Sequence, residues 1–418
     1  MKVLICIPLL EQGGTEVQTL NTVRALVQGG HEVTVACYFE HTSYMIGQFE
    51  EAGAKVILFS PDGNRLGGWR IVPFLYRNLR SVIKAVRPDI VHVQYMTPGA
   101  LVILLLWLMG VKNIIATVHT AADIYKGLRL IHFIQRHCVR AWICITERAE
   151  HSFFGSSQLY SKDMVLGKRN HFTIYNSLPL RYSERLNAAE QQVNCDDSQV
   201  KSCVAAVKGD GLEVNQSQGD DSPATPLRFT SNSVAINRSE AAPVLGLVSR
   251  LEHIKGMDLV VPAFAEVRKR FPDVQLLVVG DGSLRAAMEQ QAMALGCDDA
   301  VTWAGRQPQE ELSQYYIRMD IVLMPSRSEG FGLTAIEAMA HGCVVVASDI
   351  GGLPEVVRDG VCGLLHRSED VRDMAEKICS LIASSELYRS LQKNALQHVQ
   401  KFSFQRYAEL IHNLYGKL

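Results

Sequence analysis

The chain lacks two features that would narrow its class at once, a net charge and an apolar run long enough to cross a membrane. Its 418 residues include 42 Lys and Arg and 43 Asp and Glu, which gives a formal net charge of −1. The run ALVILLLWLM at 100–109 falls well short of the ~20 apolar residues that a membrane-spanning helix needs. It predicts a buried helix or an interfacial contact. A near-neutral chain of this length is typical of a globular protein with about two or three domains.

The chain also lacks the spacing patterns of metal sites and of P-loop enzymes. Its ten cysteines are scattered, and Cys6, Cys37 and Cys144 lie in apolar runs where a reduced thiol packs as a small hydrophobe. This pattern favours a reducing cytoplasm. The absence of a P-loop argues against kinases and ATPases. The GDG at 280–282 lacks the third glycine of a dinucleotide fingerprint, so it favours a loop near a nucleotide over a nicotinamide site.

Short apolar runs rich in Val and Ile recur along the first 180 residues and predict β-strands. Helical-period segments lie between several of them. The N-terminal run superficially resembles a signal peptide, but it is too short, only one lysine precedes it and no small-residue cleavage site follows. The alternation predicts a parallel sheet covered on both faces. The expected strands are at 3–7, 31–39, 54–59, 89–95, 113–119, 141–146 and 172–175.

A polar, irregular segment from about 181 to 242 interrupts this alternation. Its centre, at 205–225, holds few apolar residues and predicts a mobile insertion or linker. Two doubly wound domains joined in this way place their ligand crevice at the carboxyl ends of the strands, at the domain interface. The alternation resumes with strands expected at 243–249, 274–280, 300–305, 320–326 and 343–348.

Several residues follow predicted strands and are therefore expected at the crevice. Gly14, in the motif EQGGTE, lets backbone amides approach a ligand, although paired glycines are also ordinary turn residues. Arg250 and Lys255 suit a diphosphate or, alternatively, are loop cations in water. His119 suits a sugar hydroxyl or is satisfied by the backbone. His92, inside a strand, is assigned a structural role.

The stretch SEGFGLTAIEA at 328–338 follows a predicted strand and carries two carboxylates. Glu329 falls in the loop at the crevice, and Glu337 falls one to two turns into the next helix. They are not the neighbouring pair that residues three or four apart form on a helix. The two carboxylates are therefore expected to serve different atoms of one ligand. The amides of Gly332 and Leu333 can meet an anion at the helix N-terminus.

These motifs together resemble those of the retaining GT-B glycosyltransferases of family 4. The resemblance covers nearly the whole chain except roughly 181–240, and its most specific part is the run at 328–365. The interdomain segment is several times longer than the family's usual connector, and YNS stands where YNG is common. The other matching motifs are GGTE at 13–16, TVH at 117–119, YNS at 175–177, SRLEHIKGMD at 249–258, VVGDGSL at 278–284 and FSF at 402–404.

The resemblance implies an α/β fold of the GT-B type, with two doubly wound Rossmann-like domains and an active-site cleft between them. It divides the chain into four parts. These are an acceptor-side domain at 1–180, a polar insertion or linker at 181–240, a nucleotide-sugar-binding domain at 241–400 and a C-terminal helix at 401–418 that packs back on the first domain.

The resemblance also implies roles for individual residues. Arg250 and Lys255 would bind the donor diphosphate, and Glu329 would contact the donor sugar. Glu337 would contact the ribose, and Arg306 would lie beside the nucleobase. The residues expected to take part in catalysis are His119, Arg250, Lys255 and Glu329. Those expected to bind the nucleotide-sugar are Gly14, Arg250, Lys255, Gly280, Arg306, Gly330, Phe331, Gly332, Leu333 and Glu337.

The implied activity is retaining transfer of a sugar from a nucleotide-sugar to a hydroxyl of a cell-envelope glycolipid or polysaccharide precursor. A UDP-sugar is favoured over a GDP-sugar. Protein cations take the place of a catalytic metal, so no metal and no other cofactor is expected. Two alternatives remain, a sugar-nucleotide epimerase of the same architecture and a non-catalytic sugar-nucleotide-binding module. No nucleic-acid partner is expected.

Charge is unevenly distributed along the chain. Residues 61–180 hold 15 Lys and Arg against 6 Asp and Glu, a local surplus of +9. Together with the apolar run at 100–109 and RLIHFIQR at 129–136, this surplus suits docking of a cytoplasmic enzyme on an anionic inner leaflet. The alternative is that the apolar residues belong to the core and the cations are merely solvated.

Overall fold

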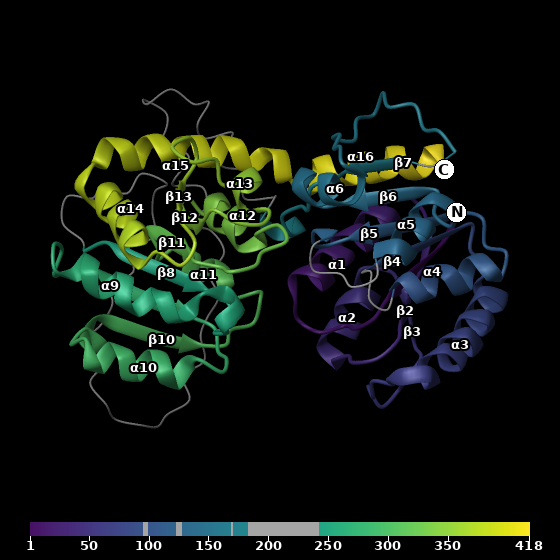
Figure 1. The fold of residues 1–418 in the computed structure, drawn as a ribbon, viewed down its shortest axis with the longest axis horizontal. Helices are drawn as coiled ribbons and strands as arrows, with labels where there is room; N and C mark the ends of the chain where they lie inside the picture. Colours follow the sequence, from purple (N-terminus) through teal and green to yellow (C-terminus); the bar gives the residue numbers. More distant parts are fainter. Residues whose placement is uncertain (95–98, 123–127, 169, 183–241) are drawn as a thin grey trace, which may run out of the picture.

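The computed structural model describes residues 1–94, 99–122, 128–168, 170–182 and 242–418. They form two α/β domains, each built on one parallel sheet with helices on both faces (Figure 1). The strand order is β3-β2-β1-β4-β5-β6-β7 in the first domain and β10-β9-β8-β11-β12-β13 in the second. In each sheet, the strand that comes first along the chain lies in the interior, and the later strands are added on both sides of it. The prediction of two doubly wound sheets is therefore confirmed.

The strands lie close to the predicted apolar runs. Those of the first sheet are β1 (Lys2–Ile7), β2 (Glu32–Cys37), β3 (Lys55–Leu58), β4 (Ile90–Gln94), β5 (Ile114–Val118), β6 (Ala141–Cys144) and β7 (Asn170–Thr173). Those of the second are β8 (Val244–Val248), β9 (Gln275–Val279), β10 (Val301–Gly305), β11 (Ile321–Met324), β12 (Val344–Ser348) and β13 (Leu364–His366). The three-residue strand β13 was not predicted, because it is too short to stand out as an apolar run.

Helices connect these strands. In the first domain they are α1 (Gly14–Gln28), α2 (Ser43–Glu51), η1 (Gly68–Arg70), α3 (Ile71–Val86), α4 (Gly99–Leu108), α5 (Leu128–His137) and α6 (Glu147–Phe154). In the second they are η4 (His253–Lys255), η5 (Met257–Leu259), α9 (Val260–Arg268), α10 (Arg285–Ala294), η6 (Asp298–Ala300), α11 (Leu312–Tyr316), α12 (Leu333–Ala340), α13 (Leu353–Val356), α14 (Val371–Ala383) and α15 (Ser385–Val399), followed by η7 (Gln400–Phe402) and α16 (Phe404–Lys417). None of the helices in the described ranges is both long and apolar enough to cross a bilayer.

The first sheet buries both faces, as β1 illustrates. Val3 and Ile5 belong to one apolar cluster, and Leu4 and Cys6 belong to another, because successive side chains of a strand point to opposite faces. Helices α1, α2 and α16 contribute to the first cluster, and α3, α4 and α5 contribute to the second. The sheet is therefore a packed layer between two layers of helices.

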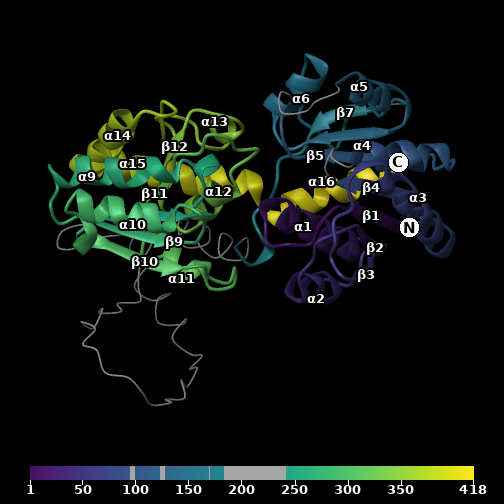
Figure 2. The ribbon, with the colours of Figure 1, turned by 60° about the horizontal axis from the view of Figure 1, so that its bottom comes forward.

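The last helix, α16, returns to the first domain. Figure 2 shows it lying along α1. The hydroxyl groups of Tyr407 and Thr22 are 2.7 Å apart and hydrogen-bonded. Phe404 and Ile411 are buried in the apolar cluster under the first sheet. The C-terminal helix thus ties the end of the chain to the domain where the chain begins.

Three further predictions can be compared with the structure. Cys6, Cys37 and Cys144 are buried and free, as expected. The run at 100–109 forms α4, which buries Val102 and Leu106 yet leaves Trp107 and Leu108 exposed. The predicted mobile insertion lies outside the described residues, apart from Arg181 and Tyr182 at its start. Tyr182 is buried, and its hydroxyl donates to the Gln309 carbonyl oxygen at 3.3 Å.

Candidate functional site

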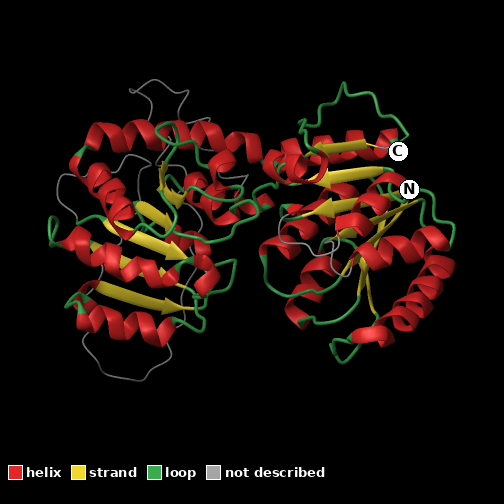
Figure 3. Ribbon diagram, viewed as in Figure 1, coloured by secondary structure: helices red, strands yellow, loops and turns green. Residues whose placement is uncertain are grey.

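The carboxyl ends of the two sheets face each other across the domain interface (Figure 3). Gly330, after β11, lies so close to β5 that a Cβ atom at this position would be 2.2 Å from the His119 carbonyl oxygen. Only glycine fits there without moving the backbone. The Leu333 side chain, at the start of α12, would lie 3.3 Å from a Cβ atom at Gly14. The structure therefore brings these predicted site residues of both domains together.

Lys255 and Glu329 form the charged centre of the second domain's edge. The Lys255 ammonium donates to Glu329 Oε2 at 2.7 Å, and the two side chains are 21% and 16% exposed. They line a cavity of about 30 Å³ at the carboxyl ends of β8 and β11. The other residues that line it are Val248, Ser249, Met257, Leu323, Met324, Ser326 and Thr334. A partly buried cation and a partly buried carboxylate thus stand side by side at the crevice.

Arg327 holds together the two loops that carry this pair. Its guanidinium donates to both oxygens of Asp258 at 2.6 and 2.8 Å, to both oxygens of Glu369 at 2.5 and 2.8 Å, and to the His253 carbonyl at 2.7 Å. Its backbone amide also donates to the Ile254 carbonyl at 2.9 Å. These bonds fix the η4–η5 segment, which carries the lysine, against the loop that carries Glu329. The sequence gives no signal for the role of Arg327, because its partners Asp258 and Glu369 are far away along the chain.

His119 is buried at the end of β5. Its Nε2 lies 2.9 Å from Gln94 Oε1, so Nε2 carries the hydrogen of that bond. Burial lowers the His119 pKa to about 3, which keeps the ring neutral at pH 7. Behind Gln94, the His92 ring contacts the Thr117 hydroxyl at 2.6 Å and the Tyr415 hydroxyl at 2.7 Å. A buried polar chain therefore connects α16 to the crevice, and His92 has the structural role assigned to it.

Glu337 has an environment unlike that of Glu329. It is buried in α12 and accepts a hydrogen bond from the Tyr316 hydroxyl at 2.9 Å. Burial raises the Glu337 pKa to about 7 because the charged form loses hydration. The two carboxylates thus have separate partners, in keeping with their spacing in the sequence.

The other predicted residues occupy varied positions at the crevice. Arg250, after β8, is exposed. Arg306, after β10, is exposed and donates to the Gln12 side chain of the first domain at 3.2 Å. Gly280 has a φ of 135° and passes so close to the Ser249 carbonyl oxygen that a Cβ atom would be 1.8 Å from it. Only glycine fits this turn.

Phe331 and Gly332 form the backbone turn that leads into α12. The Phe331 ring is buried in the domain interface, with its centroid 6.1 Å from that of Tyr175 and 5.5 Å from that of Phe402. A contact of Phe331 with a donor would therefore use its backbone. Gly332 is the N-cap residue of α12, with a φ of 104°.

A second interdomain contact caps helix α6. Both Glu355 carboxylate oxygens accept backbone amides of the first domain, from Glu147 at 2.8 Å and from Arg148 at 2.7 Å. A carboxylate at a helix N-terminus is stabilised by the unpaired amides and the helix dipole. Gly352, on the same segment, donates to the Glu329 carbonyl at 3.0 Å. The α13 segment therefore connects the Glu329 loop to the first domain.

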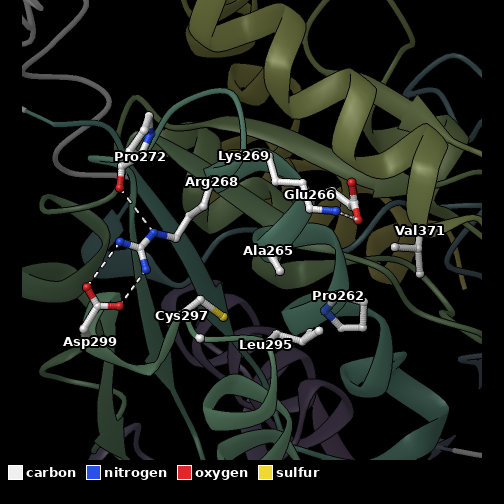
Figure 4. Close-up of a pocket in the computed structure, with 11 residues that line it drawn as sticks. Pro262, Ala265, Glu266, Arg268, Lys269, Pro272, Leu295, Cys297, Asp299 and Val371 are labelled. Carbon is white, nitrogen blue, oxygen red and sulfur yellow. Dashed lines mark hydrogen bonds and ion pairs between the residues drawn. The ribbon is translucent and has the colours of Figure 1, made fainter.

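A larger hollow, of about 520 Å³, lies elsewhere on the second domain (Figure 4). Arg268, at the end of α9, and Lys269, directly after it, line this hollow and pair with Asp299 and Glu266, respectively. Pro272 and Asp299 precede β9 and β10, so this hollow is at the amino edge of the sheet. Ligands of open α/β sheets bind at the carboxyl edge. Within the described ranges, no group of three or more His, Cys, Asp or Glu residues is arranged to hold a metal ion.

Two family models match the chain, one in each domain. The model described as "Glycosyltransferase Family 4" matches residues 12–154. The model described as "Glycosyl transferases group 1" matches residues 229–398. Together they contain all the predicted site residues.

Curated relatives match over part of the chain. A D-inositol 3-phosphate glycosyltransferase of Segniliparus rotundus is 39% identical over 170 residues, which are 40% of this chain and 38% of the relative. One from Nocardia farcinica is 38% identical over 174 residues, 40% of this chain and 39% of the relative. The alignments thus span less than half the length of these relatives.

Solved structures match over the whole length. HepE from Anabaena, crystallised with UDP, has a TM-score of 0.72 at 17% identity, with 100% of both chains covered. Sucrose-phosphate synthase from Thermosynechococcus elongatus has a TM-score of 0.68 at 19% identity, with 100% of this chain and 98% of the other covered. The lipopolysaccharide outer core galactosyltransferase WaaB has a TM-score of 0.68 at 16% identity, with 100% of both chains covered. The chain therefore belongs to the family 4 glycosyltransferases, and its two domains have the GT-B fold.

Proposed function

We propose that this protein is a retaining glycosyltransferase that moves a sugar from a nucleotide-sugar, a UDP-sugar rather than a GDP-sugar, to a hydroxyl group. The acceptor is a cell-envelope glycolipid or polysaccharide precursor, met at the cytoplasmic side of the membrane. The observation that carries the proposal is the Lys255–Glu329 pair beside a small cavity at the carboxyl ends of β8 and β11. A leaving diphosphate needs a cation there, and a sugar hydroxyl needs an acceptor oxygen.

The names of related proteins support the choice of substrates. HepE has been crystallised with UDP-glucose, and WaaB is named for the lipopolysaccharide outer core. The curated relatives are named as glycosyltransferases acting on inositol phosphate. These names favour a uridine nucleotide-sugar as donor and a polyhydroxylated envelope precursor as acceptor.

In the proposed reaction, each residue acts by charge or by position. Lys255 and Arg250 stabilise the negative charge that grows on the diphosphate as its bond to the sugar carbon breaks. Glu329 accepts a hydrogen bond from the donor sugar, and Glu337 accepts one from the ribose. His119, neutral and held by the Gln94 side chain, packs beside the sugar near the reacting carbon.

Retention follows from attack on the face that the leaving group vacates. The acceptor oxygen forms its bond to the sugar carbon as the carbon–phosphate oxygen bond breaks, and the acceptor proton passes to a phosphate oxygen. The two-carboxylate scheme of glycoside hydrolases is not required, because Glu329 and Glu337 lie in different environments and serve as positioning groups.

A donor screen without acceptor tests the proposal. We expect slow release of the nucleoside diphosphate from one or more UDP-sugars, faster than from GDP-sugars. When an acceptor is then added, the sugar should keep its anomeric configuration in the transfer product. Recovery of an epimerised nucleotide-sugar would instead identify an epimerase. Tight donor binding without turnover towards any envelope acceptor would identify a binding module.

A chelation experiment tests the role given to the protein cations. We expect activity to survive EDTA, since Lys255 and Arg250 supply the charge that a divalent ion supplies in other transferases. Loss of activity in EDTA that only manganese or magnesium restores would overturn this part of the proposal.

A further inference from the structure

One face of the first domain combines exposed apolar side chains with positive charge. It consists of η1, α3, α4 and α5, with α4 packed between α3 and α5 over one side of the first sheet (Figure 1). We call this surface the α3–α5 face. Its exposed large apolar residues are Trp69, Val72, Tyr76, Trp107, Leu108, Leu130 and Phe133.

These exposed side chains are not part of the apolar core, because each helix packs on the sheet through other residues. Helix α3 already buries Leu79, and α5 already buries Ile134, against the sheet. Trp69 is nevertheless 78% exposed and Leu108 is 65% exposed. The Trp107 ring meets the Phe133 ring edge-on, with centroids 6.2 Å apart, which connects α4 to α5 on the outer surface. The exposed apolar side chains of α4 and α5 thus meet on the outer surface, next to those of η1 and α3.

The charge of the α3–α5 face has one sign. The helices α3, α4 and α5 contain no Asp and no Glu. Their exposed Lys and Arg residues are Arg77, Arg80, Lys84, Arg129 and Arg136. Aromatic side chains next to a set of Lys and Arg residues form the combination that binds the headgroup region of an anionic bilayer.

We propose that the α3–α5 face docks on an anionic lipid bilayer. A second copy of the chain suits the face poorly, because a symmetric pairing would bring identical cations together. A bilayer offers anionic headgroups to the cations and an apolar layer to the Trp and Leu side chains. The inference deepens the proposed function by placing the acceptor-side domain against the membrane, but the face itself does not depend on any catalytic residue.

Vesicle flotation tests the proposal with the full chain. Vesicles of phosphatidylcholine alone are compared with vesicles that also contain phosphatidylglycerol, each at low and at high salt. We expect binding to the anionic vesicles at least about tenfold stronger than to the neutral ones, and weaker at high salt, because the cations contribute through the surface potential.

Matched variants identify the face. Arg77→Glu combined with Arg80→Glu should lower vesicle binding by at least about tenfold, whereas Arg372→Glu, an exposed change on α14 of the second domain, should not. Trp69→Ala should lower it severalfold, whereas Ile317→Ala, at a position 58% exposed in the second domain, should not. All five positions are exposed, and circular dichroism checks that each variant folds.

Tryptophan fluorescence distinguishes insertion of the Trp side chains into the bilayer from electrostatic attraction of the protein to the bilayer surface. Lipids brominated on the acyl chains should quench the tryptophan fluorescence of the bound protein, and Trp69→Phe should remove much of that quenching. Equal, salt-independent binding to both vesicle types, or no binding, would overturn the proposal. Concentration-dependent dimerisation that Trp69→Ala abolishes would also overturn it, because the face would then pair two copies. Unchanged donor hydrolysis in these variants would keep the docking result separate from the proposed activity.

Discussion

The two sides of the cleft are built in different ways. On the side of the second domain, Lys255 and Glu329 pair with each other, and Arg327 fixes their loops through bonds made within that domain. On the side of the first domain, Gly14 and the His119 backbone reach the site through close contacts with Leu333 and Gly330. The Lys255–Glu329 pair is therefore complete within one domain, whereas the contribution of the first domain depends on how the two domains meet.

This difference suits a two-substrate enzyme. A charged pair held within one domain can bind the nucleotide-sugar without rearranging the other domain, and its ion pairs limit the reorganisation needed when the diphosphate leaves. Contacts such as Glu355 with the N-terminus of α6 then hold the first domain in place. Changes at the Lys255–Glu329 pair should therefore affect catalysis directly, and changes between the domains should affect it by altering how the domains meet.

The largest effect is expected from removing the donor-side cations. Lys255→Ala and Arg250→Ala should each lower turnover at least tenfold. The loss can approach ~100-fold, which is the effect of removing one charge-stabilising group in other enzymes. Steady-state kinetics with the best donor measures this. Lys269→Ala serves as the control, because Lys269 is an exposed lysine directly after α9 that pairs with Glu266. Near-normal kinetics in both variants would contradict the assignment of Lys255 and Arg250 to the donor diphosphate.

A smaller effect is expected at Arg327, which positions the pair without touching the substrate. Arg327→Gln should lower kcat/KM by about tenfold, because the loops that carry Lys255 and Glu329 lose their common anchor. Arg268→Gln is the matched control, since Arg268 also donates two bonds to one carboxylate, at 2.6 and 3.2 Å to Asp299. A purely structural role for Arg327 would lower the melting temperatures of both variants alike and leave kcat/KM unchanged in both.

The sequence predicts the donor side better than the support around it. The strands appear as apolar runs, and Lys255 and Glu329 lie in the loops that follow two of them, so that parallel topology alone places both at one edge. Arg327 cannot be found in this way, because its partners Asp258 and Glu369 come together only in the folded domain. Gln94, the partner of His119, cannot be found from the sequence for the same reason. The contact of Glu355 with α6 cannot be found either, because it depends on how the two domains meet.

A still smaller effect is expected from loosening the domain contact. Glu355→Gln removes the charge at the N-terminus of α6, an interaction of ~0.3–1 kcal/mol, so KM for the acceptor should rise up to about fivefold while donor hydrolysis stays nearly unchanged. Steady-state kinetics with acceptor measure the KM for the acceptor, and kinetics without acceptor measure donor hydrolysis. Glu386→Gln is the control, because Glu386 lies in the first turn of α15, within one domain. Equal losses in hydrolysis and transfer would show that Glu355 acts on the donor side after all.

The last effect concerns the pH dependence of stability at Glu337 and not turnover. Burial raises its pKa from 4.5 to about 7 in the folded protein, so between these values the folded state holds a proton that the unfolded state has lost. Unfolding then releases a proton, and the free energy of unfolding falls as pH rises from about 4.5 to 7, by at most ~1.4 kcal/mol per pH unit. Glu337→Gln, which keeps the shape and can still accept from Tyr316, should flatten this decline, with the two curves parallel above pH 7. Denaturant unfolding at several pH values in that range measures the difference. Curves that stay parallel from pH 4.5 upward would mean that Glu337 is already ionised in the folded protein, and that the burial of this carboxylate costs less than its surroundings indicate.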